Sequence, residues 1–325
     1  MNNFKKIGLS ALAGSLVAMS AAQSEVTVSG GASIAIGKTH DSDRSYYYQN
    51  DSISFSYSGE TDGGLNVTTS LELDGDASGG GGGDFDSQSI KIGSDDMGTV
   101  TFSAHGGDSV VGGWDDVMPT AYEEVFALTK NVSDAATGAG NLTIGGFSGN
   151  HLWRYDSPSI SGVSVHAAYQ SQAQTGNVSS YSDMGIQIAP EMVDGLTIGY
   201  ATGEYDESAT VLGVDVSTMW VKYVYGSITV GYQESEDDGP TSATTDESKS
   251  MAISYAVNDD FSVSYGQHEY DDGDSTLVDQ ESSGFSASYT MGGTTIKAAF
   301  NETDNIRGVA SNDEDSFEIA MSFAF

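Results

Sequence analysis

The chain has 325 residues, no cysteine, four prolines and 41 glycines, and its formal net charge at pH 7 is -36. The lack of cysteine excludes disulfide bonds and thiol chemistry. Hydrophobic residues make up only 38% of the sequence, which is low for a bundle of membrane helices but typical of strands that alternate apolar and polar side chains.

Residues 1–24 have the features of a secretory signal peptide. Lys5 and Lys6 form a short positive region, an apolar run follows from residue 7 to about residue 19, and small residues precede Glu25. The apolar run is shorter than the roughly 20 residues that a membrane-spanning helix needs. We therefore expect cleavage after Ser24, with cleavage after Ala22 as the alternative, and a mature single domain of residues 25–325.

From residue 26 to the C-terminus, apolar residues recur at every second position in short segments separated by polar turns. Alternate side chains of a β-strand point to opposite faces, so this period of two predicts strands. Sixteen such segments are present, and one apolar residue identifies each of them: Val28, Phe55, Leu71, Ile90, Val100, Trp153, Val165, Ile186, Ile198, Val221, Val230, Ile253, Val263, Phe285, Ala298 and Ile319.

Two features favour a membrane-spanning barrel over the alternative, a soluble β-sandwich. Tyrosines and phenylalanines concentrate at strand ends, where interfacial aromatic girdles lie. The connections alternate between short and long, as they do when periplasmic turns are short and external loops are long. In lipid, only a closed barrel satisfies the backbone groups of strands. The prediction is therefore an all-β protein, a sixteen-strand antiparallel transmembrane β-barrel.

Charged residues divide between loops and lumen in this interpretation. Most acids fall in the predicted external loops, and the sixth and seventh are dense in them: Glu236, Asp237, Asp238, Asp246 and Glu247, then Asp271, Asp272, Asp274 and Asp279. Because Ca²⁺ and Mg²⁺ prefer several carboxylate oxygens, Asp271, Asp272 and Asp274 are candidates for a weak Ca²⁺ site, although a solvated acidic loop is the favoured alternative. No other cofactor is expected. Four basic residues have the inward parity of their strands: Lys91, Arg154, Lys222 and Lys297.

One connection breaks the alternation of turns and loops. About fifty residues without a convincing strand pair separate Phe102 from Trp153, and a structureless loop of that length is usually functional. It contains several acids: Asp108, Asp115, Asp116, Glu123 and Glu124.

Three motifs resemble those of the general, non-specific diffusion porins of Gram-negative bacteria, especially the alphaproteobacterial ones. Residues 98–102 (GTVTF) resemble the strand that leads into the family's third loop, and residues 154–158 (RYDSP) resemble the strand that follows it. The terminal Phe325, with Phe323 before it, resembles the signal read by the outer-membrane barrel assembly machinery. The resemblance implies a homotrimer in the outer membrane, in contact with its lipid.

The family resemblance also implies that the third loop folds into the lumen. Its acids would then face basic wall residues, of which Arg154 matches the motif. The basic side is sparse here, because the strand before the loop ends Ser103-Ala104-His105 where relatives often have Gly-Arg, and residues 51–58 contain no base. Weakly opposed acids at a narrow passage favour cations modestly.

The predicted function is therefore a water-filled, weakly cation-selective channel for passive diffusion of small hydrophilic solutes and ions. A substrate-specific porin and a non-conducting structural or adhesive barrel remain as alternatives. An enzyme is not expected, because the five histidines are scattered and no serine or cysteine nucleophile motif accompanies them. No nucleic-acid partner is expected.

Overall fold

The computed structural model describes residues 25–38, 45–74, 85–128, 143–171, 180–206, 213–239 and 245–325. The predicted signal peptide, residues 1–24, lies outside the described residues, so its cleavage remains a prediction. Within the described ranges, no helix is long and apolar enough to span a membrane.

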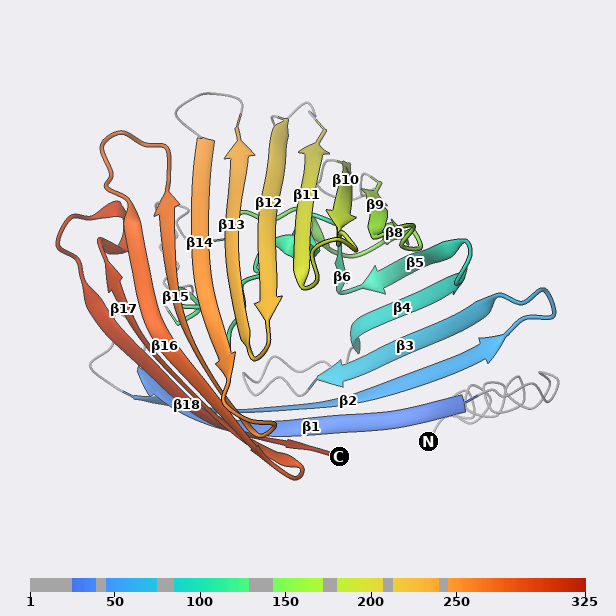
Figure 1. The fold of residues 1–325 in the computed structure, drawn as a ribbon, viewed down its shortest axis with the longest axis horizontal. Coiled ribbons are helices and arrows are strands. Elements are labelled where there is room, and N and C mark those ends of the chain that lie inside the picture. The colour runs from blue at the N-terminus through green and yellow to red at the C-terminus, as the bar shows by residue number, and fades with distance from the viewer. Residues whose placement is uncertain are drawn as a thin grey trace, which may run out of the picture.

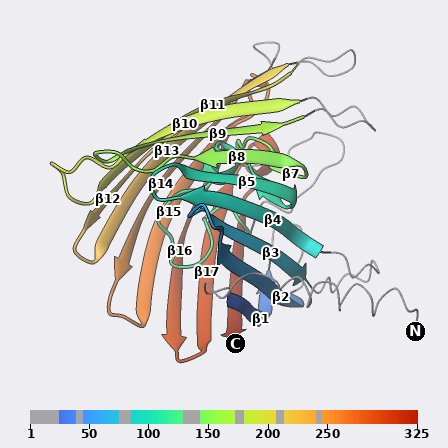
Figure 2. The ribbon, with the colours of Figure 1, turned by 90° about the vertical axis from the view of Figure 1, so that its right-hand side faces the viewer.

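Sixteen antiparallel strands of the described chain form one closed barrel (Figures 1 and 2), as the sequence predicted. Each strand pairs with its neighbours along the chain, and β1 pairs with β18 to close the ring. We call this last pair the closing seam. The strands are β1 Glu25–Lys38, β2 Tyr46–Glu60, β3 Asn66–Asp74, β4 Phe85–Ser94, β5 Gly98–His105, β8 Leu152–Asp156, β9 Val163–Gln170, β10 Tyr181–Ile188, β11 Leu196–Tyr205, β12 Val214–Tyr225, β13 Ile228–Asp238, β14 Thr245–Ala256, β15 Phe261–Asp271, β16 Gln280–Met291, β17 Thr294–Asp304 and β18 Glu314–Ala324.

Most of the large apolar side chains of the strands lie on the outer surface of the barrel. Across β13–β18, the strand register joins six of them into one row: Val230, Ile253, Tyr265, Phe285, Phe300 and Phe317. Phe285 and Phe300 are 64% and 54% exposed, whereas the adjacent Ser286 is buried. An apolar outside with small polar residues inside is the pattern of a barrel in lipid.

Several strands continue further than their apolar residues do. β13 extends to Asp238 and β14 begins at Thr245, so the acids assigned above to the sixth loop lie on strands instead. The period of two persists there, but glutamates replace the outward apolar residues while Ser235 stays buried inside. A search for alternating apolar residues ends these strands too early for that reason.

The chain terminus lies at the closing seam. Backbone hydrogen bonds join Phe325 and Gly30 in both directions, with N–O distances of 2.9 and 3.0 Å. A Cβ atom on Gly30 would lie 2.8 Å from the Phe325 ring, so glycine permits this close approach. Phe325 and Phe323 are exposed at 75% and 42%. Their recognition by the assembly machinery remains a prediction.

Candidate pore constriction

The connection between β5 and β8 is called loop L3 here, and its described parts, residues 106–128 and 143–151, pack against the inner wall of the barrel. It begins and ends with a two-residue strand pair, β6 (Gly107–Asp108) with β7 (Ser148–Gly149), followed by a short 3-10 helix, η1 (Gly112–Trp114). Figure 1 shows β6 and the segment after it among the barrel strands. The predicted inward course of the third loop is seen in the contacts that follow.

Arg154 binds the backbone near the start of L3. Its Nη1 donates to the main-chain oxygens of Asp108 and Ser109, at 3.3 and 2.9 Å, and its Nε donates to Asp156 Oδ1 at 3.0 Å. Asp156 also pairs with His166 Nδ1 at 2.7 Å. The predicted wall arginine therefore contacts loop backbone and a strand carboxylate.

Asp183 of β10 anchors the next turn of the loop. This carboxylate is 6% exposed, and its Oδ2 accepts from the Val111 amide at 2.8 Å and from the Tyr181 hydroxyl at 3.1 Å. Beside it, Val110, Val111 and Trp114 join a buried cluster in which the rings of Trp114 and Trp220 pack edge to face with centroids 5.5 Å apart. Such hydrogen bonds to a charged acceptor contribute about 1.5–3 kcal/mol each.

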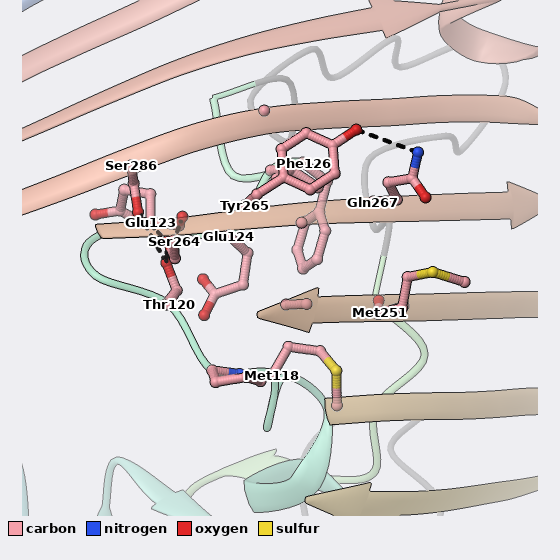
Figure 3. Close-up of a pocket in the computed structure, with 16 residues that line it drawn as sticks. Met118, Thr120, Glu123, Glu124, Phe126, Met251, Ser264, Tyr265, Gln267 and Ser286 are labelled. Carbon is pink, nitrogen blue, oxygen red and sulfur yellow. Dashed lines mark hydrogen bonds between the residues drawn. The ribbon is translucent and has the colours of Figure 1, made fainter. Parts of the chain in front are cut away.

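Neutral wall side chains hold the middle of L3. Gln233 of β13 accepts from the Val117 amide at 3.1 Å and donates to the Trp114 carbonyl at 2.5 Å. Further along, the Thr120 hydroxyl forms hydrogen bonds with the hydroxyls of Ser264 and Ser286, at 3.4 and 3.2 Å (Figure 3). The two serine hydroxyls also accept from successive loop amides, Ala121 at 3.0 Å and Tyr122 at 3.1 Å. These bonds fix the main chain of the loop along β13–β16.

Glycines of the wall let the loop approach closely. A Cβ atom on Gly185 would lie 2.7 Å from Val110, and one on Gly231 would lie 2.6 Å from Pro119. Both distances are shorter than real Cβ contacts allow, so any larger residue would displace the loop from the wall. Sequence reasoning missed these positions, because a glycine inside a strand indicates close backbone approach without naming the partner.

The five predicted acids of L3 stay accessible to solvent. Asp108 and Asp116 are exposed, whereas the other three are half-buried. Four of them form two pairs, each directly after a residue that contacts the wall. Asp115 and Asp116 follow Trp114 of η1, and Glu123 and Glu124 follow Tyr122. The last two border a pocket between L3 and β14–β16 (Figure 3). The wall contacts described above are made by the backbone and uncharged groups of the loop.

The four predicted bases are spread around the wall instead of forming one cluster. Lys91 is exposed and shares a register row with Arg154, because both lie opposite Thr101. Two strand spacings of about 4.8 Å separate them. Lys222 Nζ lies 5.1 Å from the ring centroid of Trp220, and Lys297 Nζ lies 5.1 Å from that of Tyr122.

The predicted calcium ligands Asp271 and Asp274 accept hydrogen bonds from their own turn. Among the described residues, no group of three or more His, Cys, Asp or Glu side chains could hold a metal ion. Asp271 accepts from the Gly273 amide, and Asp274 accepts from the amide and hydroxyl of Thr276. The two bonds from Thr276 lower the pKa of Asp274. The pKa of Asp272 is raised, mainly by burial and then by the negative charges of Asp274 and Asp271. The carboxylates stabilise their own turn, and the Ca²⁺ site remains a prediction.

A closed barrel with an apolar exterior and an inward loop defines a β-barrel membrane channel. The chain matches the family model of the Gram-negative porins over residues 8–325, and it belongs to that family. It is an outer-membrane porin channel and not an enzyme, which confirms the predicted class and location. No curated protein sequence matches it.

Solved porin structures share this fold at low sequence identity. An anion-selective porin from Comamonas acidovorans has a TM-score of 0.67 and 14% identity, covering 93% of this chain and 100% of that one. OmpT of Vibrio cholerae, folded in vitro, has a TM-score of 0.64 and 12% identity, with 93% and 98% covered. A mutant of the Rh. blastica porin has a TM-score of 0.62 and 15% identity, with 93% and 100% covered. Such likeness shows the fold alone.

Proposed function

We propose that this porin is a general diffusion channel with a weak preference for cations, through which small hydrophilic solutes and ions pass passively. One observation carries the proposal: the five predicted acids of L3 are partly or fully exposed to solvent, and they outnumber the four predicted basic residues of the wall. Arg154 binds loop carbonyls and Asp156, and two lysines lie over aromatic rings. The accessible charge at the narrowed passage is therefore mainly negative.

The expected selectivity is modest. Two unit charges 4 Å apart interact by about 1 kcal/mol in bulk water and about 4 kcal/mol at an effective dielectric constant near 20. A few acids beside a hydrated path thus shift the ion preference without making it absolute. A porin of similar fold from Comamonas acidovorans is named as anion-selective. The preference for cations or anions must therefore come from local charges and not from the fold.

The test neutralises two loop acids together. Asp115→Asn with Asp116→Asn should reduce the K⁺ preference measured from reversal potentials, because these carboxylates lie beside the anchored η1. Asp95→Asn with Asp96→Asn, in the exposed turn after β4, is the matched control and should leave the preference unchanged. Equal preference in wild type and the loop variant would contradict a role for this pair.

The alternative of a substrate-specific porin would require a row of aromatic side chains along the lumen. The aromatic residues of L3 serve as wall anchors instead: Trp114 and Phe126 are 7% and 3% exposed, and Tyr122 donates to Glu318 of β18. This favours the non-specific channel. A non-conducting structural or adhesive barrel would show no single-channel current in a planar bilayer.

The finer assignment, a homotrimer of alphaproteobacterial type folded by the barrel assembly machinery, is also proposed. A similar fold in the Rh. blastica porin is consistent with that type. On the outer face, Ala287 and Ala298 lie opposite each other in an apolar groove bordered by Phe285 and Phe300, where another subunit could pack. Sedimentation of the refolded protein in detergent tests this, and a monomer would contradict it.

A further inference from the structure

The last strand carries one carboxylate that is buried inside the barrel. Glu318 of β18 is only 4% exposed. A buried carboxylate is unfavourable unless hydrogen bonds replace its lost hydration. Three phenol hydroxyls do so: Tyr46 donates to Oε2 at 2.5 Å, Tyr48 donates to Oε1 at 3.0 Å, and Tyr122 also donates to Oε1. Glu318 thus joins three separate segments of the chain.

Two of these donors reach across the closing seam. Tyr46 and Tyr48 belong to β2, Glu318 belongs to β18, and β1 lies between them. Gly37 of β1 is in register with both Tyr46 and Glu318, and a Cβ atom on it would lie 2.3 Å from the Tyr46 hydroxyl. Because Gly37 has no side chain, Tyr46 can pass over β1 to Glu318. The hydrogen bonds therefore tie β2 to β18 over the pair that closes the barrel.

The third donor comes from L3. The Tyr122 amide donates to Ser286, its ring lies under Lys297 Nζ, and its hydroxyl reaches Glu318. Burial, reinforced by the neighbouring carboxylate, raises the pKa of Tyr122 well above its usual value, so the phenol stays protonated and donates. An ionised carboxylate has about four acceptor sites, enough for three phenols at once.

We propose that Glu318 is a positioning residue that fastens L3 to the closing seam, so that a single carboxylate holds both the aperture of the channel and the closure of the barrel. It acts on the aperture through Tyr122. This inference rests on the channel function and is independent of which ion the channel prefers. Removing individual hydroxyls should separate the two roles.

The experiment compares Tyr122→Phe with Tyr46→Phe in planar bilayers, using graded neutral polymers to measure the aperture and heat unfolding in detergent to measure closure. In Tyr122→Phe, loss of a bond to a charged acceptor should raise the occupancy of altered conductance substates at least about tenfold and shift the polymer size limit. Its unfolding midpoint should fall by less than that of Tyr46→Phe, because the bonds across the closing seam remain.

Tyr46→Phe should behave in the opposite way, with a lower unfolding midpoint and unchanged substates and polymer limit. Glu318→Gln should show both defects; if it does not fold, the two single-hydroxyl variants still decide. Tyr232→Phe, on the outer face, is the matched control. Wild-type substates and polymer limit in Tyr122→Phe, or the same combined defect in both tyrosine variants, would overturn the proposal. A changed reversal potential with an unchanged aperture would concern selectivity only.

Discussion

At the residue scale, the path of L3 along the wall depends on glycines, which have no side chain, as well as on the side chains that bind the loop. Asp183, Gln233, Ser264 and Ser286 bind the backbone of L3, but they can do so only because wall glycines admit the loop. Gly231, beneath Pro119, is the clearest case, since its neighbour is the rigid ring of a proline.

Gly231→Val should therefore push L3 away from the wall and into the lumen, which narrows the passage and lowers single-channel conductance. Gly63→Val is the control, because Gly63 lies in a turn where the nearest atom to an added Cβ is 3.9 Å away. Unchanged conductance in Gly231→Val, with a normally folded barrel, would show that the loop does not rest on this glycine.

Arg154 shows what the sequence could and could not predict about single residues. Its inward parity and its motif both follow from the sequence, and the structure places it at the base of L3. Its partners, the carbonyls of residues 108 and 109, could not be predicted, because parity gives the face of a strand and not the atoms opposite it. The same holds for Tyr122 and Glu318, which are 196 residues apart in the chain.

At the scale of elements, the outer ends of β13–β17 carry a row of charged side chains that strand register places side by side. The row runs Glu234, Lys249, Glu269, Glu281 and Asp304. Lys249 reduces the repulsion among these acids at one position, where its Nζ lies 4.0 Å from Glu269. Beyond it, Glu281 lies between two acids, and like charges directly opposite each other destabilise a sheet.

Glu281→Lys should stabilise the barrel, because it would replace two repulsive cross-strand pairs with attractive ones, each worth about 0.2–1 kcal/mol. The measurement is the free energy of unfolding in urea, and the gain should shrink in high salt because of screening. Glu60→Lys is the control, since Glu60 lies opposite the neutral Asn66. A less stable Glu281→Lys barrel would contradict this account of the row.

The elements themselves were largely predictable from the sequence. Alternating apolar residues located all sixteen barrel strands, because the outer face must be apolar in lipid. The strand ends were missed where outward residues become acidic, as at Glu236 and Glu247, and the short pair β6 and β7 carries too few residues for any period to appear.

At the scale of the whole molecule, the formal charge of -36 and the accessible acids of L3 act in the same direction. In the proposed account, acidic outer segments would concentrate cations near the mouth, and the loop acids would favour cations at the passage. Screening limits the first effect to about 10 Å at 0.1 M salt, so the preference should weaken as ionic strength rises. The fold predicts a channel, whereas only these charges predict whether it prefers cations or anions.

The most direct test of this central claim is the reversal potential of the wild-type channel across a KCl gradient, measured first at low and then at high total salt. We predict a potential of the sign that indicates K⁺ permeating more readily than Cl⁻, and a smaller preference at high salt. A potential that indicates preference for Cl⁻ at low salt would contradict the cation-selective account.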